Sequence, residues 1–202
     1  MDKITFFNKM AVDWDWKFYT DEKILHIRNV VSEFHLTESA TILDAGTGTG
    51  GIIPFILEQI GQKGHVEAID YAEEMIKIAK EKFSNENRVR FHQCDVANTP
   101  FKDEFFDYVI CFGLFPHIED KAKALYEINR ILKDKGRIII AHALSSDELK
   151  SHHLRCDVVK DDLLSDESEI MMLLEDAGFQ SIRLIDRQGM YLCEGIKIRG
   201  VI

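Results

Sequence analysis

Apolar residues along this chain follow two spacings that alternate. Short apolar runs predict buried strands at residues 41–43, 66–70, 89–93, 105–113, 137–142, 179–186 and 190–198. Apolar positions three or four residues apart predict helices at residues 21–34, 52–60, 72–83, 121–132 and 167–177. Strands that alternate with helices are typical of an α/β fold. We therefore expect one α/β domain (residues 1–202), an open twisted sheet with helices on both faces.

A glycine-rich turn follows the first predicted strand. Asp44 precedes three glycines that alternate with other residues, Gly46, Gly48 and Gly50, and a helix is predicted from residue 52. Such a turn places free backbone N–H groups and the positive end of the helix dipole at one point. A Cβ there would block the turn and keep a ligand away from the backbone. The stretch therefore suits a nucleotide-like or carboxylate-bearing cofactor.

Composition narrows the class of protein. The 202 residues suffice for one domain, and 46% hydrophobic residues supply a full core. The net charge of -10, without a local basic run, argues against nucleic acid as a partner. Four scattered cysteines and a start without a signal peptide predict reduced thiols and a cytoplasmic location. The longest apolar run, residues 138–144, is too short to cross a membrane, so a small molecule or a protein is the expected partner.

The acid and the glycines of the turn have the spacing Asp-x-Gly-x-Gly-x-Gly at residues 44–50. This pattern resembles motif I of the class I S-adenosylmethionine-dependent methyltransferases, in the branch that acts on small molecules. The resemblance covers residues 41–141, about half of the chain, in element order and motif spacing. It implies a Rossmann-like open sheet of seven strands with the last strand antiparallel. It also implies S-adenosylmethionine as cofactor and in-line transfer of its methyl group to a small-molecule acceptor.

The resemblance assigns cofactor-binding residues. Asp70 ends the second predicted strand, twenty residues beyond Gly50, where a Rossmann-type fold presents an acid to ribose hydroxyls. The alternative is a surface acid at a strand end. The resemblance implies that Asp95 binds the adenine amino group. Without the resemblance, a lone aspartate at such a place favours a turn or a helix cap. The residues expected around the cofactor are Asp44, Gly46, Thr47, Gly48, Gly50, Asp70, Tyr71, Met75, Asp95, Val96 and Phe112.

The segment after the fourth predicted strand, residues 114–118, bears on the acceptor. It lacks the Asn/Asp-Pro-Pro-aromatic motif of family members that methylate planar amino groups, which disfavours a nucleobase or a glutamine amide. It resembles instead the segment of methyltransferases that act on lipid-like and small metabolite substrates. A base is needed only if the acceptor loses a proton near neutral pH. His117, His142 and Tyr19 are the candidates, and the alternative for His117 is that it holds the loop.

Residues 1–36 are expected to form a helical cap. The first 19 residues contain both tryptophans of the protein and several other aromatic side chains among charges. Large aromatic side chains most often serve packing, so they could staple the N-terminus onto the domain. The other interpretation, which the resemblance supports, is a lid over the mouth of the cofactor site.

Three helix ends carry recognisable signals. Thr20 is expected to cap the helix that follows it. Gly136 is expected to adopt the left-handed conformation that closes a helix. Ser145 and Glu148 fit a capping box that opens another helix.

Residues 142–178 are expected to form a helical insertion or cover, and residues 179–202 a hairpin that completes the sheet. Glu148 and His152 are four residues apart and share one helix face. With His142 they could hold a divalent metal ion. The alternatives for His142, His152 and His153 are solvated surface histidines and histidines that face the acceptor or handle its proton.

Two other classes of function stay open beside the methyltransferase. A nicotinamide-dependent oxidoreductase is disfavoured because the dinucleotide fingerprint has the spacing G-x-G-x-x-G. A non-catalytic protein that binds S-adenosylmethionine or a metal would keep the cofactor site and lack transfer.

Overall fold

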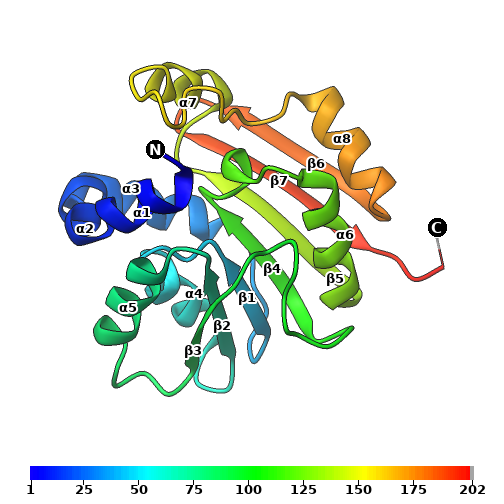
Figure 1. The fold of residues 1–202 in the computed structure, drawn as a ribbon. Coiled ribbons are helices and arrows are strands. Elements are labelled where there is room, and N and C mark those ends of the chain that lie inside the picture. The colour runs from blue at the N-terminus through cyan, green and yellow to red at the C-terminus, as the bar shows by residue number, and fades with distance from the viewer. Residues whose placement is uncertain (201–202) are drawn as a thin grey trace.

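A computed structural model of the protein describes residues 1–200 and contains one seven-stranded sheet (Figure 1). The strands are β1 (Thr41–Ala45), β2 (His65–Asp70), β3 (Val89–Gln93), β4 (Phe106–Phe112), β5 (Leu132–His142), β6 (Phe179–Arg187) and β7 (Met190–Lys197). Their order in the sheet is β3-β2-β1-β4-β5-β7-β6. Strands β1 to β5 are parallel, whereas β7 runs antiparallel to both β5 and β6. The predicted sheet with an antiparallel last strand is confirmed, and this strand lies inside the sheet, between β5 and β6.

Helices cover both faces of the sheet (Figure 1). They are α1 (Lys3–Met10), α2 (Trp14–Phe18), α3 (Asp21–Ser32), α4 (Ile53–Ile60), α5 (Glu73–Lys82), α6 (Lys121–Ile131), α7 (Ser146–His153) and α8 (Glu167–Asp176), with 3-10 turns η1 (Ala11–Asp13) and η2 (Phe115–His117). α3 and α4 pack on one face, and α6 and α8 on the other. Side chains alternate along a strand, so Ile42 of β1 faces α3 and α4 while Leu43 faces α6 and α8.

The helix ends confirm one capping signal and correct another. Ser145 accepts a hydrogen bond from the Glu148 amide, and the Glu148 carboxylate accepts one from the Ser145 amide. This is the predicted capping box, and it opens α7. Thr20 precedes α3 as predicted, but its side chain makes no capping hydrogen bond. Asp21 and Glu22 in the first turn of α3 place negative charge near the helix N-terminus instead.

β5 begins earlier than predicted, at Leu132 directly after α6. Lys135, and not Gly136, takes the left-handed conformation, with a φ of 62°. The prediction for Gly136 was wrong because this glycine serves a close approach. A Cβ on Gly136 would lie 2.9 Å from the carbonyl oxygen of Lys133.

All four cysteines are free, and no helix within residues 1–200 is long and apolar enough to cross a membrane. The cytoplasmic location stays a prediction.

Candidate active site

The glycine turn lies at the carboxyl end of β1, next to the carboxyl ends of β2 and β4. The Gly46 and Thr47 amides both donate to the carbonyl oxygen of Ile69, at 2.8 and 2.9 Å, which fixes the turn against β2. Gly46, Gly48 and Gly50 have φ values of 72°, 54° and 82°, a conformation that glycine adopts without strain. The alternating glycines of the sequence are thus required by the path of the backbone.

Space around the turn differs between two of its glycines. A Cβ on Gly46 would lie 2.8 Å from Leu114, so this position packs against the segment after β4. A Cβ on Gly48 would meet nothing closer than Trp14 Nε1 at 3.8 Å and Met75 Sδ at 4.0 Å. The backbone at Gly48 is therefore covered by side chains of other elements and not by the sheet itself.

Two buried carboxylates flank the turn. Asp44 accepts a 2.7 Å hydrogen bond from the Thr47 hydroxyl, and burial raises the pKa of Asp44 to about 7. Asp70 accepts hydrogen bonds from the backbone amides of Gly48 and Ala72, at 2.9 and 2.8 Å. Burial raises the pKa of Asp70 as well, although these amides act in the opposite direction. Buried negative charge is costly alone, so this pair fits a ligand with positive charge and hydroxyl donors.

Tyr71 extends the site beyond Asp70. Its hydroxyl group is buried and has no hydrogen-bond partner within residues 1–200, although burial raises the pKa of Tyr71 and keeps it protonated. Buried polar atoms without a partner are rare in folded proteins. Met75 lies one helical turn further, buried, and contributes apolar surface. An acid, a free hydroxyl group and an apolar wall together fit a nucleoside.

Asp95 and Val96 lie after β3 in different surroundings. Asp95 is exposed, and its carboxylate accepts a 2.9 Å hydrogen bond from the Ala97 amide, which forms a local turn. Val96 is buried and packs in the core that α6 and α8 share. The turn is the local role that an isolated aspartate favours. Contact of either residue with adenine stays a prediction.

The N-terminal cover, defined as residues 1–19, lies over this site. Phe7 contacts the ring of Tyr71, with ring centroids 6.1 Å apart, and the ring of His117, at 5.2 Å. Trp14 packs beside Phe7 at 5.9 Å and reaches Gly48. The aromatic side chains of the cover thus join the cofactor end of the site to the segment after β4.

Tyr19 ends the cover at the far side of the turn. A Cβ on Gly51 would collide with its ring, so glycine is needed there for packing. Burial raises the pKa of Tyr19 to about 12.

His117 lies in η2, after β4, and its Nδ1 is 2.7 Å from a carboxylate oxygen of Asp162. The second carboxylate oxygen of Asp162 forms an ion pair of 2.8 Å with Lys3 of α1. His153 packs against His117, with ring centroids 5.3 Å apart, and its Nδ1 lies 2.6 Å from the carbonyl oxygen of Asp162. Three separate parts of the chain therefore meet at His117.

His142 at the end of β5 and His152 of α7 lie in other surroundings. His142 is stacked on Phe112, and its Nδ1 accepts a 3.0 Å hydrogen bond from the Leu144 amide. Glu148 accepts hydrogen bonds from the Ser145 and Gly189 amides. His152 is exposed. Within residues 1–200 no group of three His, Cys, Asp or Glu side chains is placed so that it could hold a metal ion, so the structure does not bring His142, Glu148 and His152 together as such a site.

Comparison with known proteins assigns the chain to a family. Residues 36–178, more than half of the chain, match the family described as methyltransferase domain. The chain belongs to this family. Its glycine turn and its strand order are those of a class I S-adenosylmethionine-dependent methyltransferase, so the cofactor is S-adenosylmethionine.

Relatives of this methyltransferase include two demethylmenaquinone methyltransferases. Those of Staphylococcus haemolyticus and Staphylococcus aureus (strain JH9) are each 34% identical to it over 113 residues. The alignments cover 55% of this chain and 47% and 46% of the relatives. The chain therefore matches about half the length of these relatives.

Solved structures share the whole fold of the methyltransferase. A S-adenosylmethionine-dependent methyltransferase from Aquifex aeolicus is 25% identical, with a TM-score of 0.75 over 98% of this chain and 100% of that one. A chain from the complex between the Haloferax volcanii Trm112 methyltransferase activator and a methyltransferase has a TM-score of 0.79 at 21% identity, over 98% and 99%. The second likeness concerns the fold alone.

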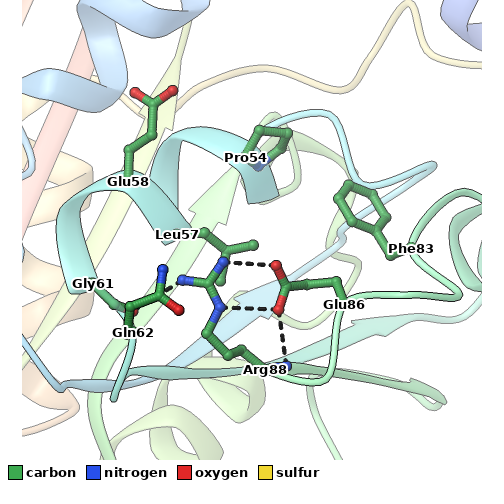
Figure 2. A pocket seen from close by; sticks show the side chains of 8 residues that line it. All are labelled: Pro54, Leu57, Glu58, Gly61, Gln62, Phe83, Glu86 and Arg88. Carbon is green, nitrogen blue, oxygen red and sulfur yellow. Dashed lines mark hydrogen bonds and ion pairs between the residues drawn. The ribbon is translucent and has the colours of Figure 1, made fainter.

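A surface groove of about 450 Å³ lies away from this site (Figure 2). It is formed by α4, the end of that helix at Gly61, and the residues before β3. Arg88 crosses it and forms hydrogen bonds to both carboxylate oxygens of Glu86 and to the Gly61 carbonyl oxygen. Arg88 is thus paired with Glu86, while Glu58, also in the groove, forms an ion pair with Arg28 of α3.

Two residues that the structure brings to the methyltransferase site, Lys3 and Asp162, were not predicted from the sequence. Asp162 lies 45 residues from His117, in a polar segment between α7 and α8 that was interpreted as a loop or flexible cover. Several neighbouring residues in that segment are also aspartates, Asp157, Asp161 and Asp166. No local pattern distinguishes the aspartate that faces inward.

Proposed function

We propose that this methyltransferase transfers a methyl group to a small-molecule acceptor. The observation that carries the proposal is the enclosure of the site, since Phe7 and Trp14 lie across it from Gly48 to His117. An acceptor must therefore reach the site beneath these side chains, which favours a small molecule over a polymer. The named substrate of the staphylococcal relatives, demethylmenaquinone, and the net charge of -10 support the same class of acceptor.

The cofactor would be held by residues at the carboxyl ends of four strands, β1 to β4. Asp70 would accept hydrogen bonds from the ribose hydroxyls, and Tyr71, Met75, Asp95 and Val96 would surround the adenine. The ends of β1 and β4 and the turn itself would complete the site through Asp44, Gly46, Thr47, Gly48, Gly50 and Phe112. S-adenosylmethionine supplies a methyl group that its positive sulfur already activates, so the chain itself must align the acceptor and take up any proton it loses.

His117 is the best placed of the three candidate bases. His142 has its Nδ1 occupied by the Leu144 amide, and burial together with neighbouring histidines lowers its pKa to about 3. In that neutral form Nε2 carries the proton and cannot accept another. The hydroxyl group of Tyr19, with its pKa raised to about 12, stays protonated near neutral pH. His117 differs from His142 because its Nδ1 faces a carboxylate oxygen of Asp162, and no protein hydrogen bond to its Nε2 is found within residues 1–200.

Two measurements test the proposal. Calorimetric titration should give binding of S-adenosylmethionine and of S-adenosylhomocysteine, and none of NAD. Incubation with a panel of quinols, phenols, amines and thiols should then yield S-adenosylhomocysteine with at least one acceptor. Cofactor binding without turnover on any acceptor would favour the non-catalytic binding protein, and binding of NAD alone would overturn both.

A further inference from the structure

The pair formed by His117 and Asp162 joins three elements. His117 ends η2, Asp162 lies in the segment between α7 and α8, and Lys3 opens α1. The two Asp162 oxygens are divided between partners, one 2.7 Å from His117 Nδ1 and one 2.8 Å from Lys3 Nζ. Asp162 is 8% exposed, so this arrangement lies beneath the surface.

Asp162 is ionised in this setting. Burial alone would raise its pKa, but hydrogen bonds from His117 and Lys3 outweigh burial and lower it. A carboxylate can only accept hydrogen bonds. His117 must therefore donate from Nδ1, which fixes the position of the ring.

The consequence lies at the other nitrogen of His117. With the proton on Nδ1, Nε2 of the neutral ring carries a lone pair and can accept a proton. The backbone amide of Leu144 imposes the opposite tautomer on His142. Two neighbouring histidines at the end of the sheet thus differ in which nitrogen is free.

We propose that Asp162 is a positioning residue that holds His117 in the tautomer of a general base, and that Lys3 completes this pair only when the N-terminal cover is closed. The proposal rests on the proposed function. Phe7 and Lys3 belong to the same helix, and Phe7 packs on the His117 ring at 5.2 Å. Closure of α1 therefore places the ion pair and the aromatic contact together.

This arrangement specifies a class of acceptor. Amines react as free bases and need no proton removed before attack, whereas a hydroxyl group becomes a good nucleophile only as its proton leaves. An imidazole can take the proton of a phenolic hydroxyl, whose pKa is about 10, far more readily than that of an alkanol. We therefore assign a phenolic hydroxyl as the acceptor.

Methyl transfer to a phenol would proceed with loss of the phenolic proton. The proton of the O–H bond moves to His117 Nε2 and is later released to water. The oxygen lone pair forms the new O–C bond to the methyl group, while the electron pair of the C–S bond stays on sulfur. Methyl ether and S-adenosylhomocysteine are the products.

The first test determines which ring nitrogen of His117 carries the proton, and it needs no substrate. Heteronuclear NMR of the histidine rings should show His117 with its proton on Nδ1 in the wild type. In Asp162→Asn the new amide can donate to Nδ1, so the proton should move to Nε2, the change by which an Asp-to-Asn exchange disables a catalytic histidine. Asp161→Asn, an exposed neighbour, is the matched control and should leave the tautomer unchanged. A wild-type His117 protonated on Nε2 overturns the assignment.

The second test reads turnover with two probes, 1,4-dihydroxynaphthalene and benzylamine. Asp162→Asn should lower turnover of the phenol on the order of 100-fold, with the affinity for S-adenosylmethionine within about threefold of wild type, and Asp162→Glu should restore part of it. Turnover within about threefold of wild type in Asp162→Asn, or methylation of the amine and not of the phenol, overturns the proposal. Failure of both probes and of the whole acceptor panel defeats the proposed function instead, while the NMR result still decides the role of Asp162.

Lys3 provides a variant that leaves the folded core untouched. Lys3→Met removes one partner of Asp162 at the start of α1 and should lower turnover of the phenol about tenfold. Lys9→Met, on the exposed side of the same helix, should not. Equal activity of the two variants would show that α1 does not contribute to the base.

Discussion

The side-chain oxygen of Asn8 accepts a 3.0 Å hydrogen bond from the backbone amide of Glu74. Glu74 lies in the first turn of α5, the helix that follows Asp70, and Ala72 at the N-cap of that helix has no side chain that could cap it. A residue of the N-terminal cover therefore supplies the cap that the local sequence lacks. The cover and the cofactor site are joined through this bond.

Asn8→Ala should destabilise the protein by about 0.5–2 kcal/mol, because it removes a helix cap. Urea denaturation measures the free energy of unfolding directly. Asn29→Ala, exposed on α3, is the control and should change stability little. Equal stability of the two variants would mean that the cap is not formed in solution.

Asp70→Asn should weaken binding of S-adenosylmethionine and S-adenosylhomocysteine about tenfold or more, since hydrogen bonds to a charged acceptor contribute roughly 1.5–3 kcal/mol each. Asparagine keeps the size of the side chain and thus spares the packing around Gly48 and Ala72. Calorimetry gives both affinities. Unchanged affinity would remove Asp70 from the cofactor site; Asp147→Asn, exposed on α7, should bind normally.

Deletion of residues 1–18 should leave a folded domain that still binds cofactor and has lost turnover. The two large cores contain no residue of this segment, which contributes only to a small cluster of Ala11, Ala72 and Met75 with Phe7 and Trp14 packed on it. A lid acts on the chemistry more than on stability. Circular dichroism and the methyl-transfer assay distinguish the two interpretations. An insoluble or unfolded product would assign the aromatic residues to stapling.

Asp44→Asn should change how stability depends on pH. The pKa of Asp44 rises from an ordinary 3.8 to about 7, so between these values the folded protein holds a proton that the unfolded chain releases. The wild-type free energy of unfolding therefore falls as pH rises through this window. Asparagine does not titrate. The free energy of unfolding of the variant should therefore rise by about 2 kcal/mol relative to that of the wild type between pH 5.5 and pH 8.

Denaturation at pH 5.5, 7 and 8 measures this gain. Asp147→Asn serves as control, since its side chain is exposed. A variant that runs parallel to wild type at all three values would contradict the raised pKa.

The glycine turn, the strands and most helices could be predicted because their signals are local. Spacing of apolar residues sets strand and helix, and the acid with its three glycines marks one turn. The prediction for Gly136 was wrong because glycine is required there by a close contact with the Lys133 backbone, and the spacing of residues does not reveal such a contact.

The acceptor side of the site could be predicted only in part for a related reason. The sequence does not distinguish His117 from His142 as the candidate base. The two differ in the hydrogen-bond partner of Nδ1, which is Asp162 for His117 and the Leu144 amide for His142. The hydrogen bond to Asp162 joins residues 45 positions apart, and Asp162 lies in a polar segment without periodicity. Contacts of this kind depend on the tertiary fold and leave no pattern in the chain.

The place of β7 between β5 and β6 has a consequence for synthesis of the protein. β7 is made after every other strand of the sheet, yet both β5 and β6 pair with it and not with each other. Until Met190–Lys197 has left the ribosome, β5 has an open edge and β6 has no partner. The parallel half around the glycine turn can assemble during translation, whereas β6 can join the sheet only after β7 has been made.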